Sequence, residues 1–361
     1  EEEVIVTVSH SGYVKRMPID TYRKQARGGR GIIGSVTKEG DFIEHLFVAS
    51  THDYLLIFTN RGKCYWLKVY DIPSMSRQSK GRNIVNLLKL GNQQMASIIN
   101  VSSFDEDEGQ GEIQPRQLVM ATKNGIVKKT KLSAYSNPRK TGVIAINLDP
   151  TDDLIGVALT TGDDHIVLGT CDGMTIRFDE SQVRSMGRAS RGVKGINLRS
   201  GDAVVDMVIV EEKAALFTVC ENGYGKRTGL ENYRSQSRGG VGLKNIKTST
   251  RNGKVVALKA VQNKDDLMMI TANGMIIRTG LDQIRSIGRN TQGVRLIKLK
   301  PSDKLVAVAK IVAEESNNNK VKSNGNDKKS KSNAKAKSKP KTKAKPKTKS
   351  KVKKKTTKKK R

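Results

Sequence analysis

The chain has 361 residues, a length that suits either one large domain or two smaller ones. It contains 67 Lys and Arg residues but only 35 Asp and Glu residues, which gives a formal net charge of +32. Such a balance predicts a polyanionic partner, and nucleic acid is the commonest one. The apolar runs have only the length of strands, so no membrane span and no membrane partner are expected.

The number and spacing of the cysteines argue against a disulfide-linked protein and against a zinc protein. Cys64, Cys171 and Cys220 are odd in number and far apart, and they form no Cys-x-x-Cys pair. Neither a disulfide framework nor a zinc site is therefore predicted, and buried free thiols in a reducing compartment are expected. The chain begins "EEEVIV" without a methionine, and we expect it to be a piece of a longer protein.

One unit of about 50 residues recurs six times along the chain. Each copy has a short apolar run, a turn that ends in glycine, and a second run with basic residues, as in "IVTVSHSGYVKRM" of the first unit. The spacing is longer between the second and third copies, where an acidic segment, residues 104–116, reads as a surface loop. The turn glycines are Gly12, Gly62, Gly125, Gly173, Gly223 and Gly274.

The turns and a second set of glycines refine this repeat. Four turns are Asn-Gly or Asp-Gly, which predicts tight type I′ hairpins with two positive φ angles. Their sequences are Asn124-Gly125, Asp172-Gly173, Asn222-Gly223 and Asn273-Gly274. A second glycine follows the turn glycine by 17 residues in odd units (Gly29, Gly142, Gly240) and by 19 in even ones (Gly81, Gly192, Gly293). The tenth position alternates likewise, with Tyr22, Tyr135 and Tyr233 against Ile72, Val183 and Ile284, so the array is a double repeat taken three times.

These units predict an all-β fold in which six small sheets of about four strands form a propeller-like disc. The disc is expected over residues 1–316, with blades near 1–50, 51–103, 116–161, 162–210, 211–261 and 262–316. An ordinary β-sandwich with chance repetition is the alternative. Residues 317–361 contain 21 Lys and Arg residues and one Asp, and we predict a disordered Lys-rich tail that adds non-specific duplex affinity.

Basic residues occupy equivalent positions of the units, which predicts a cationic rim. The fourth residue after the turn glycine is Arg16, Trp66, Lys129, Arg177, Arg227 or Arg278. Further cations flank the second glycine, namely Arg27, Arg30, Lys80, Arg82, Arg139, Lys140, Arg188, Arg191, Lys194, Arg234, Arg238, Arg289 and Arg295. Such a rim favours binding to the duplex backbone, because single-strand binding needs aromatic platforms and aromatics make up only 4% of the chain. The alternative is that these side chains are merely solvated.

The segment "QARGGRG", residues 25–31, combines both features. Glycines such as Gly28, Gly29 and Gly31 let a backbone approach a phosphate closely, while Arg27 and Arg30 supply charge and bidentate donors. The segment resembles the gyrase A box, usually Gln-Arg-Arg-Gly-Gly-Lys-Gly, in the first blade of the C-terminal domain of DNA gyrase A subunits. Gln25 also matches the box, whereas Ala26 replaces an arginine and Arg30 replaces the lysine.

This resemblance implies a six-bladed β-pinwheel that wraps duplex DNA with a right-handed sense. The full enzyme would then introduce negative supercoils with ATP and Mg²⁺, together with the breakage-reunion domain and gyrase B, in the bacterial cytoplasm at the nucleoid. The family's active tyrosine, ATP site and Mg²⁺ carboxylates lie in parts that this chain lacks. No catalytic residue, metal ligand or cofactor is therefore expected here. The predicted DNA-binding residues are Gln25, Arg27, Gly28, Gly29, Arg30, Gly31, Arg16, Lys80, Arg82, Lys129, Lys140, Arg177, Arg188, Arg191, Arg227, Arg238, Arg278 and Arg289.

Three other interpretations remain open. The nearest is the related C-terminal domain of topoisomerase IV, which has a degraded box. A stand-alone DNA-binding or scaffold propeller is the second. A hydrolase is the third, although His10, His45, His52 and His165 fall at unlike positions of the units. The acidic loop Asp105 to Glu108 could bind a cation or could simply be solvated.

Overall fold

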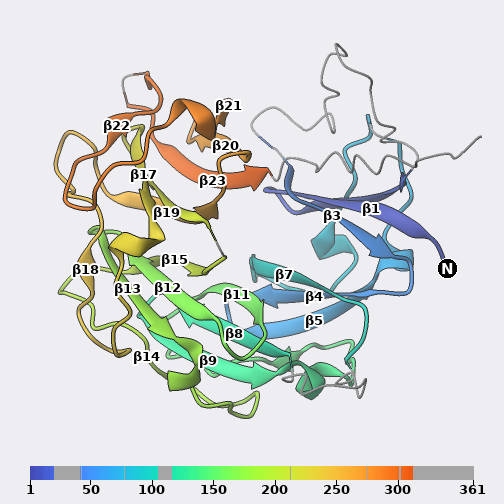
Figure 1. Ribbon diagram of the computed structural model, residues 1–361. Helices are drawn as coiled ribbons and strands as arrows, with labels where there is room; N and C mark the ends of the chain where they lie inside the picture. Colours follow the sequence, from blue (N-terminus) through green and yellow to red (C-terminus); the bar gives the residue numbers. More distant parts are fainter. Residues whose placement is uncertain are drawn as a thin grey trace, which may run out of the picture. The chain divides into compact units, whose positions relative to one another are not determined.

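The computed structural model describes residues 1–19, 41, 43–76, 78–104, 116–211, 213–273, 275–300 and 302–311 (Figure 1). The chain divides into two units, Glu1–Glu314 and Glu315–Arg361. The predictions for the tail, for residues 25–31 and for the acidic loop at 105–108 lie outside the described residues. Within the described residues, no helix has the length and apolar character that crossing a bilayer requires.

The first unit is an all-β, six-bladed propeller, as the repeat predicts. Each blade contains a hairpin and a third strand that pairs antiparallel with the first strand of the hairpin. In chain order these strands are β1 (Glu3–Ser9), β2 (Tyr13–Pro18) and β3 (Ile43–Ser50), then β4 (Tyr54–Thr59), β5 (Lys63–Lys68) and β7 (Met95–Val101), then β8 (Gln117–Thr122), β9 (Ile126–Lys131) and β11 (Leu154–Thr160). The other three blades hold β12 (His165–Thr170), β13 (Met174–Asp179) and β15 (Val204–Ile209), β16 (Ala215–Cys220), β17 (Tyr224–Gly229) and β19 (Val255–Val261), and β20 (Asp266–Thr271), β21 (Ile276–Gly280) and β23 (Leu305–Ile311).

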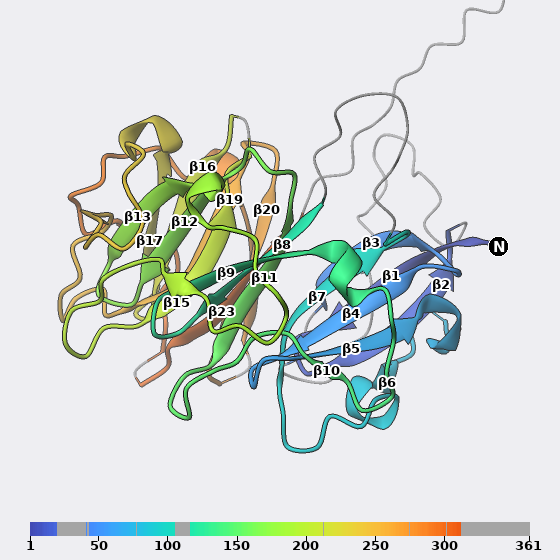
Figure 2. The same ribbon diagram turned by 90° about the horizontal axis from the view of Figure 1, so that it is seen from below.

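A fourth, outer strand comes to each of the first five blades from the following repeat unit. For example, β10 runs beside β5 of the preceding blade, as Figure 2 shows. The sequence predicts about four strands from each unit, and it does not reveal this exchange of strands. The outer strands are β6 (Arg82–Asn83), β10 (Val143–Ile144), β14 (Val193–Lys194), β18 (Leu243–Lys244) and β22 (Val294–Arg295). The sixth sheet has the order β21-β20-β23 within the described residues.

Short 3₁₀ turns follow the hairpins. They are η2 (Val69–Asp71), η4 (Leu132–Tyr135), η5 (Glu180–Gln182), η6 (Leu230–Asn232) and η7 (Leu281–Gln283), with η3 (Ile84–Asn86) after β6. The third strands β7, β11, β15, β19 and β23 contact one another in that order near the centre of the ring, and β23 also contacts β3. The short strands β14, β18 and β22 lie at its outer edge (Figure 1).

The apolar core lies between consecutive blades. Val119 and Val127 of the third blade, for example, pack in one cluster with Leu168 and Ile176 of the fourth blade, and all four are fully buried. Both faces of a blade are covered in this way, so the first strand of a hairpin is apolar throughout, as in β4, "YLLIFT". A single blade could not bury such a strand, and the ring is therefore the smallest stable arrangement.

The predicted type I′ turns are wrong. Gly125 has a φ of +82°, but Asn124 is not among the residues with positive φ, and the Asp172-Gly173 and Asn222-Gly223 turns behave likewise. Only the glycine is left-handed, as in a three-residue hairpin connection. The Asn124 amide is also bonded outside the turn, since it donates a 2.9 Å hydrogen bond to the Asp152 carboxylate.

The second glycines allow the outer strand to approach the backbone of the preceding blade closely. A Cβ on Gly192, whose φ is +98°, would lie 2.6 Å from the carbonyl oxygen of Val127 in the preceding blade. Gly81 and Gly293 show equally close approaches to backbone oxygens. In the fifth unit this role falls to Gly242, with a φ of +75°, and not to Gly240 as the predicted alternation has it. Glycine is required there because the outer strand begins in contact with its neighbour's backbone.

Candidate nucleic-acid interface

A loop connects each 3₁₀ turn to the outer strand that follows it, and these loops meet their neighbours along the ring. We call them linking loops, comprising residues 73–81, 136–142, 183–192, 233–242 and 284–293. Backbone hydrogen bonds tie each of the last three to the chain just beyond the preceding outer strand. The amides of Asn147, Asn197 and Lys247 donate to the carbonyls of Ser190, Gly240 and Thr291 at 3.1, 2.8 and 2.8 Å. These three linking loops and the outer strands before them therefore form one connected surface.

One position in the linking loops is basic in every unit, and this column was not among the predictions. The fifteenth residue after the turn glycine is Arg27, Arg77, Lys140, Arg188, Arg238 or Arg289, of which Arg27 and Arg77 lie outside the described residues. Lys140 is exposed and the three described arginines are half-buried. Alignment on the turn glycines would have revealed the column, including Arg77, which was not predicted.

Two of these arginines lie against the outer strand of the preceding unit. The Arg238 guanidinium donates a 3.0 Å hydrogen bond to the Lys194 carbonyl, and Arg289 donates a 3.4 Å bond to the Lys244 carbonyl. Both acceptor residues expose their own side chains to solvent. Each pair thus brings two cationic side chains to one place on the connected surface.

The outer strands themselves carry exposed cations. Arg82, Lys194, Lys244 and Arg295 belong to β6, β14, β18 and β22, and Lys244 was not among the predicted cations. In the third unit, the exposed Ile144 of β10 stands in place of a cation. The outer strands β6, β14, β18 and β22 therefore present positive charge, and β10 does not.

Tyrosines next to the turn glycines hold some of these cations in place. The Lys80 ammonium lies 3.9 Å from the ring centroid of Tyr13. In the fifth blade, the Tyr224 hydroxyl accepts a 2.9 Å hydrogen bond from Arg295, and Arg251 lies 4.9 Å from the same ring centroid. Hydrogen bonds from Arg251 and Arg295 lower the pKa of the Tyr224 hydroxyl. Cation–π and hydrogen-bond contacts thus orient basic side chains at this edge.

The residues four positions after the turn glycines are predicted to form part of a cationic rim, but the structure surrounds them with protein groups. Its members bond to protein groups, mostly in the next unit. Arg16 donates to the Ile72 carbonyl at 2.7 Å, the buried Lys129 to the Glu180 carbonyl at 3.0 Å, and Arg177 to the Leu230 carbonyl at 3.2 Å. Arg227 bonds to the Asn263 side chain at 2.6 Å, and Arg278 to the Asp266 carboxylate at 2.7 Å. A DNA contact by these five residues stays a prediction.

Of the remaining predicted residues, those that the structure describes are exposed. Arg191 lies in a linking loop and forms a 2.9 Å ion pair with Asp149, itself exposed. Lys80 and Arg82 lie at the junction of a linking loop with β6. Gln25, Arg27, Gly28, Gly29, Arg30 and Gly31 lie outside the described residues.

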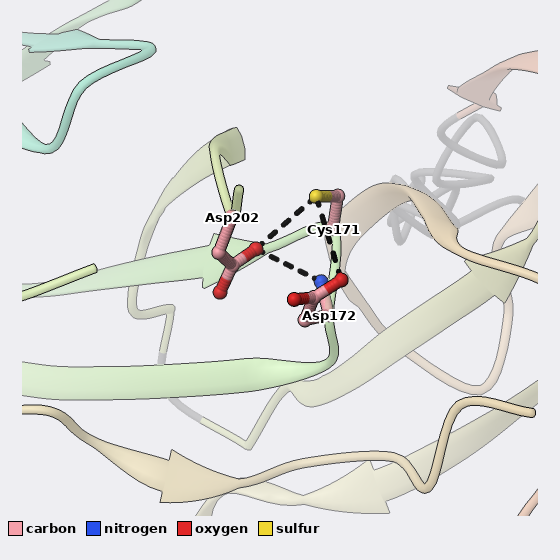
Figure 3. Close-up of side chains that lie close together, drawn as sticks. All are labelled: Cys171, Asp172 and Asp202. Atoms are coloured by element: carbon pink, nitrogen blue, oxygen red, sulfur yellow. Dashed lines mark hydrogen bonds between the residues drawn. The ribbon is translucent and has the colours of Figure 1, made fainter. Parts of the chain in front are cut away.

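A cluster of possible metal ligands lies at the turn of the fourth blade, where Cys171, Asp172 and Asp202 converge (Figure 3). The Asp202 carboxylate accepts hydrogen bonds from the Asp172 amide at 3.0 Å and from the Cys171 thiol at 3.1 Å. Asp152 and Asp303 bond in the same way to the turn amides of Asn124 and Asn273, where no cysteine is present. The carboxylate therefore fastens a hairpin turn, and burial raises the pKa of the Cys171 thiol, which keeps it protonated.

The fold places the chain in the class of six-bladed β-propellers, here with outer strands exchanged between blades. A family model described as "DNA gyrase C-terminal domain, beta-propeller" matches residues 3–50, 53–92, 116–161, 164–211, 215–262 and 265–311. The chain belongs to this family.

Curated relatives agree with the family model. The DNA gyrase A protein of Staphylococcus epidermidis is 45% identical over 320 residues, which is 88% of this chain and 35% of that protein. The DNA gyrase A protein of Salmonella typhimurium is 44% identical over 312 residues, 86% of this chain and 35% of that protein. The chain thus spans about a third of the length of these relatives. The resemblance drawn from "QARGGRG" and the six units is confirmed.

Two solved structures share the fold. The C-terminal domain of DNA topoisomerase IV superposes with a TM-score of 0.75 at 26% identity, covering 86% of this chain and 93% of that one. The DNA gyrase A C-terminal domain superposes with a TM-score of 0.66 at 27% identity, covering 86% of this chain and all of that one. The sequence identity is similar for both.

Proposed function

We propose that the chain binds duplex DNA and wraps it along the linking loops and outer strands, as the C-terminal domain of a DNA gyrase A protein. In the full enzyme this wrapping would direct ATP-dependent strand passage toward negative supercoils. Its partners would be the breakage-reunion part of gyrase A and gyrase B, and ATP and Mg²⁺ would bind in those parts. The domain would act at the bacterial nucleoid. The similarity to DNA gyrase A proteins supports the assignment to that protein, on which the other parts of the proposal rest.

The observation that carries this proposal is the repetition of charge on one connected surface. Four described linking loops each carry a basic fifteenth residue that is exposed or half-buried (Lys140, Arg188, Arg238 and Arg289), and the outer strands add Arg82, Lys194, Lys244 and Arg295. A duplex that follows this surface would meet cations from one blade after another. Each neutralised phosphate releases condensed counterions, so the binding is tolerant of sequence and weakens steeply as salt rises.

Wrapping also requires the DNA to bend, and the bend has to be held by contacts on several blades. Smooth bending of 20 to 30 base pairs through 40° to 90° costs on the order of 1 to 6 kcal/mol. Contacts from a single blade would leave the duplex straight. The ring of blades supports the bent form because it offers cations over a curved path.

A related candidate is the DNA-binding role of the C-terminal domain of topoisomerase IV, which the TM-score of 0.75 favours. In that case the domain would bind DNA without a strong wrap. The segment at residues 25–31 separates the two functions, because a nearly intact box is expected only of the wrapping domain.

The experiment is topological. The chain is incubated with nicked circular plasmid, the nick is ligated, the protein is removed, and the change in linking number is measured. A positive shift that disappears when residues 25–31 are replaced by alanine supports gyrase-type wrapping. A positive shift that survives the replacement shows that the wrap does not depend on this segment. Binding without any shift contradicts wrapping and favours the related domain.

A further inference from the structure

Three lysines are buried inside the propeller, at the same position of three blades. Lys15, Lys128 and Lys226 each follow the turn glycine by three residues, in the first, third and fifth units. Their side chains are exposed by only 2%, 0% and 0%. Lysine is almost never fully buried unless it is paired, so these three require a partner.

Those partners are backbone carbonyls of the linking loop in the following unit. The Lys15 ammonium donates to the Ser79 carbonyl at 2.8 Å and to the Ser76 carbonyl at 3.3 Å. Lys226 donates to the carbonyls of Gly288 and Arg289 at 2.7 and 2.5 Å.

The third lysine repeats this arrangement. Lys128 donates to the Arg188 carbonyl, and it also reaches the Ala145 carbonyl at 2.5 Å. Arg188 and Arg289 belong to the basic column of the linking loops. In these two blades the lysine therefore hydrogen-bonds to the backbone of Arg188 or Arg289, the residue whose guanidinium we place on the DNA surface.

The residue directly after each lysine also binds the same loop through its backbone. The amides of Met75, Met186 and Ile287 donate to the carbonyls of Arg16, Lys129 and Arg227 at 3.1, 2.8 and 2.8 Å. In the fifth blade, the Thr228 hydroxyl adds a 2.8 Å bond to the Ile287 carbonyl. The start of the loop is thus paired with a strand, while its cation-bearing part is held by the lysine.

Even blades do without this lysine. Their third position after the turn glycine is Tyr65, Ile176 or Ile277, and a fully buried Val183 or a nearly buried Ile284 fills the tenth position. In odd blades the lysine lies in the same blade as a buried tyrosine at the tenth position, Tyr135 or Tyr233. Odd and even blades, which alternate in the sequence, therefore differ in how they bind the next loop. Odd blades bind it with an ammonium group, and even blades pack against it with apolar side chains.

We propose that Lys15, Lys128 and Lys226 are positioning residues for DNA wrapping: each fixes the linking loop of the following even unit so that its cations face the duplex. This inference rests on the proposed function. The lysines touch no phosphate, since they are enclosed by protein. They act by holding loop carbonyls, which keeps the basic residue of the loop at the edge of the ring.

The experiment uses the whole 361-residue chain with K226I, a change to the residue that blades four and six already have at this position. Hydrogen exchange is measured at the amides of residues 287–291. Because Lys226 is a principal anchor of that loop, we expect exchange about tenfold faster there, with no change at residues 186–190, which Lys128 holds. The plasmid ligation assay should show a linking-number shift reduced to less than half, and the K15I/K128I/K226I triple variant should show almost none.

The matched control is I176V, a conservative change at the same position of blade four, which should alter neither readout. The slope of log affinity against log salt should fall by no more than about 0.9 in K226I, because the variant weakens at most the one phosphate contact of Arg289 and Lys226 itself touches no phosphate. An unchanged linking-number shift in K226I, or unchanged exchange at 287–291, overturns the inference. If the wild-type chain binds DNA without a shift, wrapping itself is wrong, while the exchange data still decide whether Lys226 holds the loop.

Discussion

The indole nitrogen of Trp66 donates a 2.8 Å hydrogen bond to the carbonyl of Tyr135 in the next unit. Trp66 is the one residue in the fourth column that is not basic, yet it bonds to the following unit as Arg16, Lys129 and Arg177 do. All members of the column except Arg278 therefore share an N–H donor directed at the following unit. Positive charge is secondary to that role.

Replacing Trp66 with phenylalanine should destabilise the propeller. The change keeps most of the buried aromatic area but leaves the Tyr135 carbonyl without its donor, in a residue that is fully buried. We expect a loss of about 1 to 3 kcal/mol in the free energy of unfolding, because a buried acceptor without a partner costs that much. Urea unfolding followed by circular dichroism measures it. Equal unfolding free energies for W66F and wild type would contradict the bridging role.

Removing the cations of three outer strands should weaken DNA binding in a salt-dependent way. In K194A/K244A/R295A, the slope of log affinity against log salt should fall by roughly 2 to 3, because each lost phosphate contact contributes about 0.9. Fluorescence anisotropy with a labelled duplex of random sequence gives the slope.

A control of equal charge is available in the same chain. Lys254, Lys304 and Lys310 form ion pairs with Asp172, Glu221 and Glu211, away from the outer strands. K254A/K304A/K310A changes the net charge by the same amount but should leave the slope nearly unchanged. Equal slopes for the two triple variants would show that only net charge matters.

Truncation after Ser316 should lower non-specific affinity for duplex DNA. It removes 21 Lys and Arg residues and one Asp, and such a density of charge binds phosphate without sequence preference. The magnitude of the salt slope should fall by several units, measured with the same labelled duplex. If the slope of the truncated chain equals that of the full chain, the tail takes no part in binding.

The stability of the propeller should rise with pH above neutrality, because of Lys128. Burial, with a smaller contribution from Arg188, lowers the pKa of Lys128 from 10.5 to about 7. Between those values the unfolded chain holds a proton that the folded chain has released, so the free energy of unfolding increases with pH, by up to about 1.4 kcal/mol per pH unit. Below pH 7 both states are protonated and this contribution is flat.

The comparison with K128I isolates that effect. The thiols of Cys64 and Cys220 have a pKa raised by burial, so they act in the opposite direction once unfolded thiols ionise near pH 8.5. Chemical unfolding at pH 7, 7.5 and 8 avoids them. Most of the wild-type gain over that interval should be lost in K128I, where the smaller contribution of Lys226 remains because burial lowers its pKa to about 8. A parallel pH dependence in the two proteins would refute the assignment.

The repeat could be predicted from the sequence because a glycine recurs at the hairpin turn of each unit, left-handed in the five that the structure describes, and its spacing is visible without a structure. The exchange of strands could not, because an outer strand of two residues such as Val143–Ile144 has no periodicity to detect. The turn type was wrong for a similar reason. Asn124 lacks the positive φ of a type I′ turn, and its amide bonds to Asp152, which lies 28 residues further along the chain.

The candidate site was predictable in part. Arginines near the second glycines do lie at the linking loops, since the loop begins and ends at fixed distances from the turn. What those side chains face could not be read from the sequence, as the protein partners of Lys129 and Arg177 show. The buried Lys226 is the clearest case, because lysine in a basic chain is expected at the surface.

The linking-number measurement on ligated plasmid tests the central claim most directly when the two triple variants are compared. If DNA follows the outer strands, wild type and K254A/K304A/K310A should give the same positive shift, and K194A/K244A/R295A should give less than half of it. Equal shifts for the two triple variants, or no shift with wild type, would contradict a wrap along this surface.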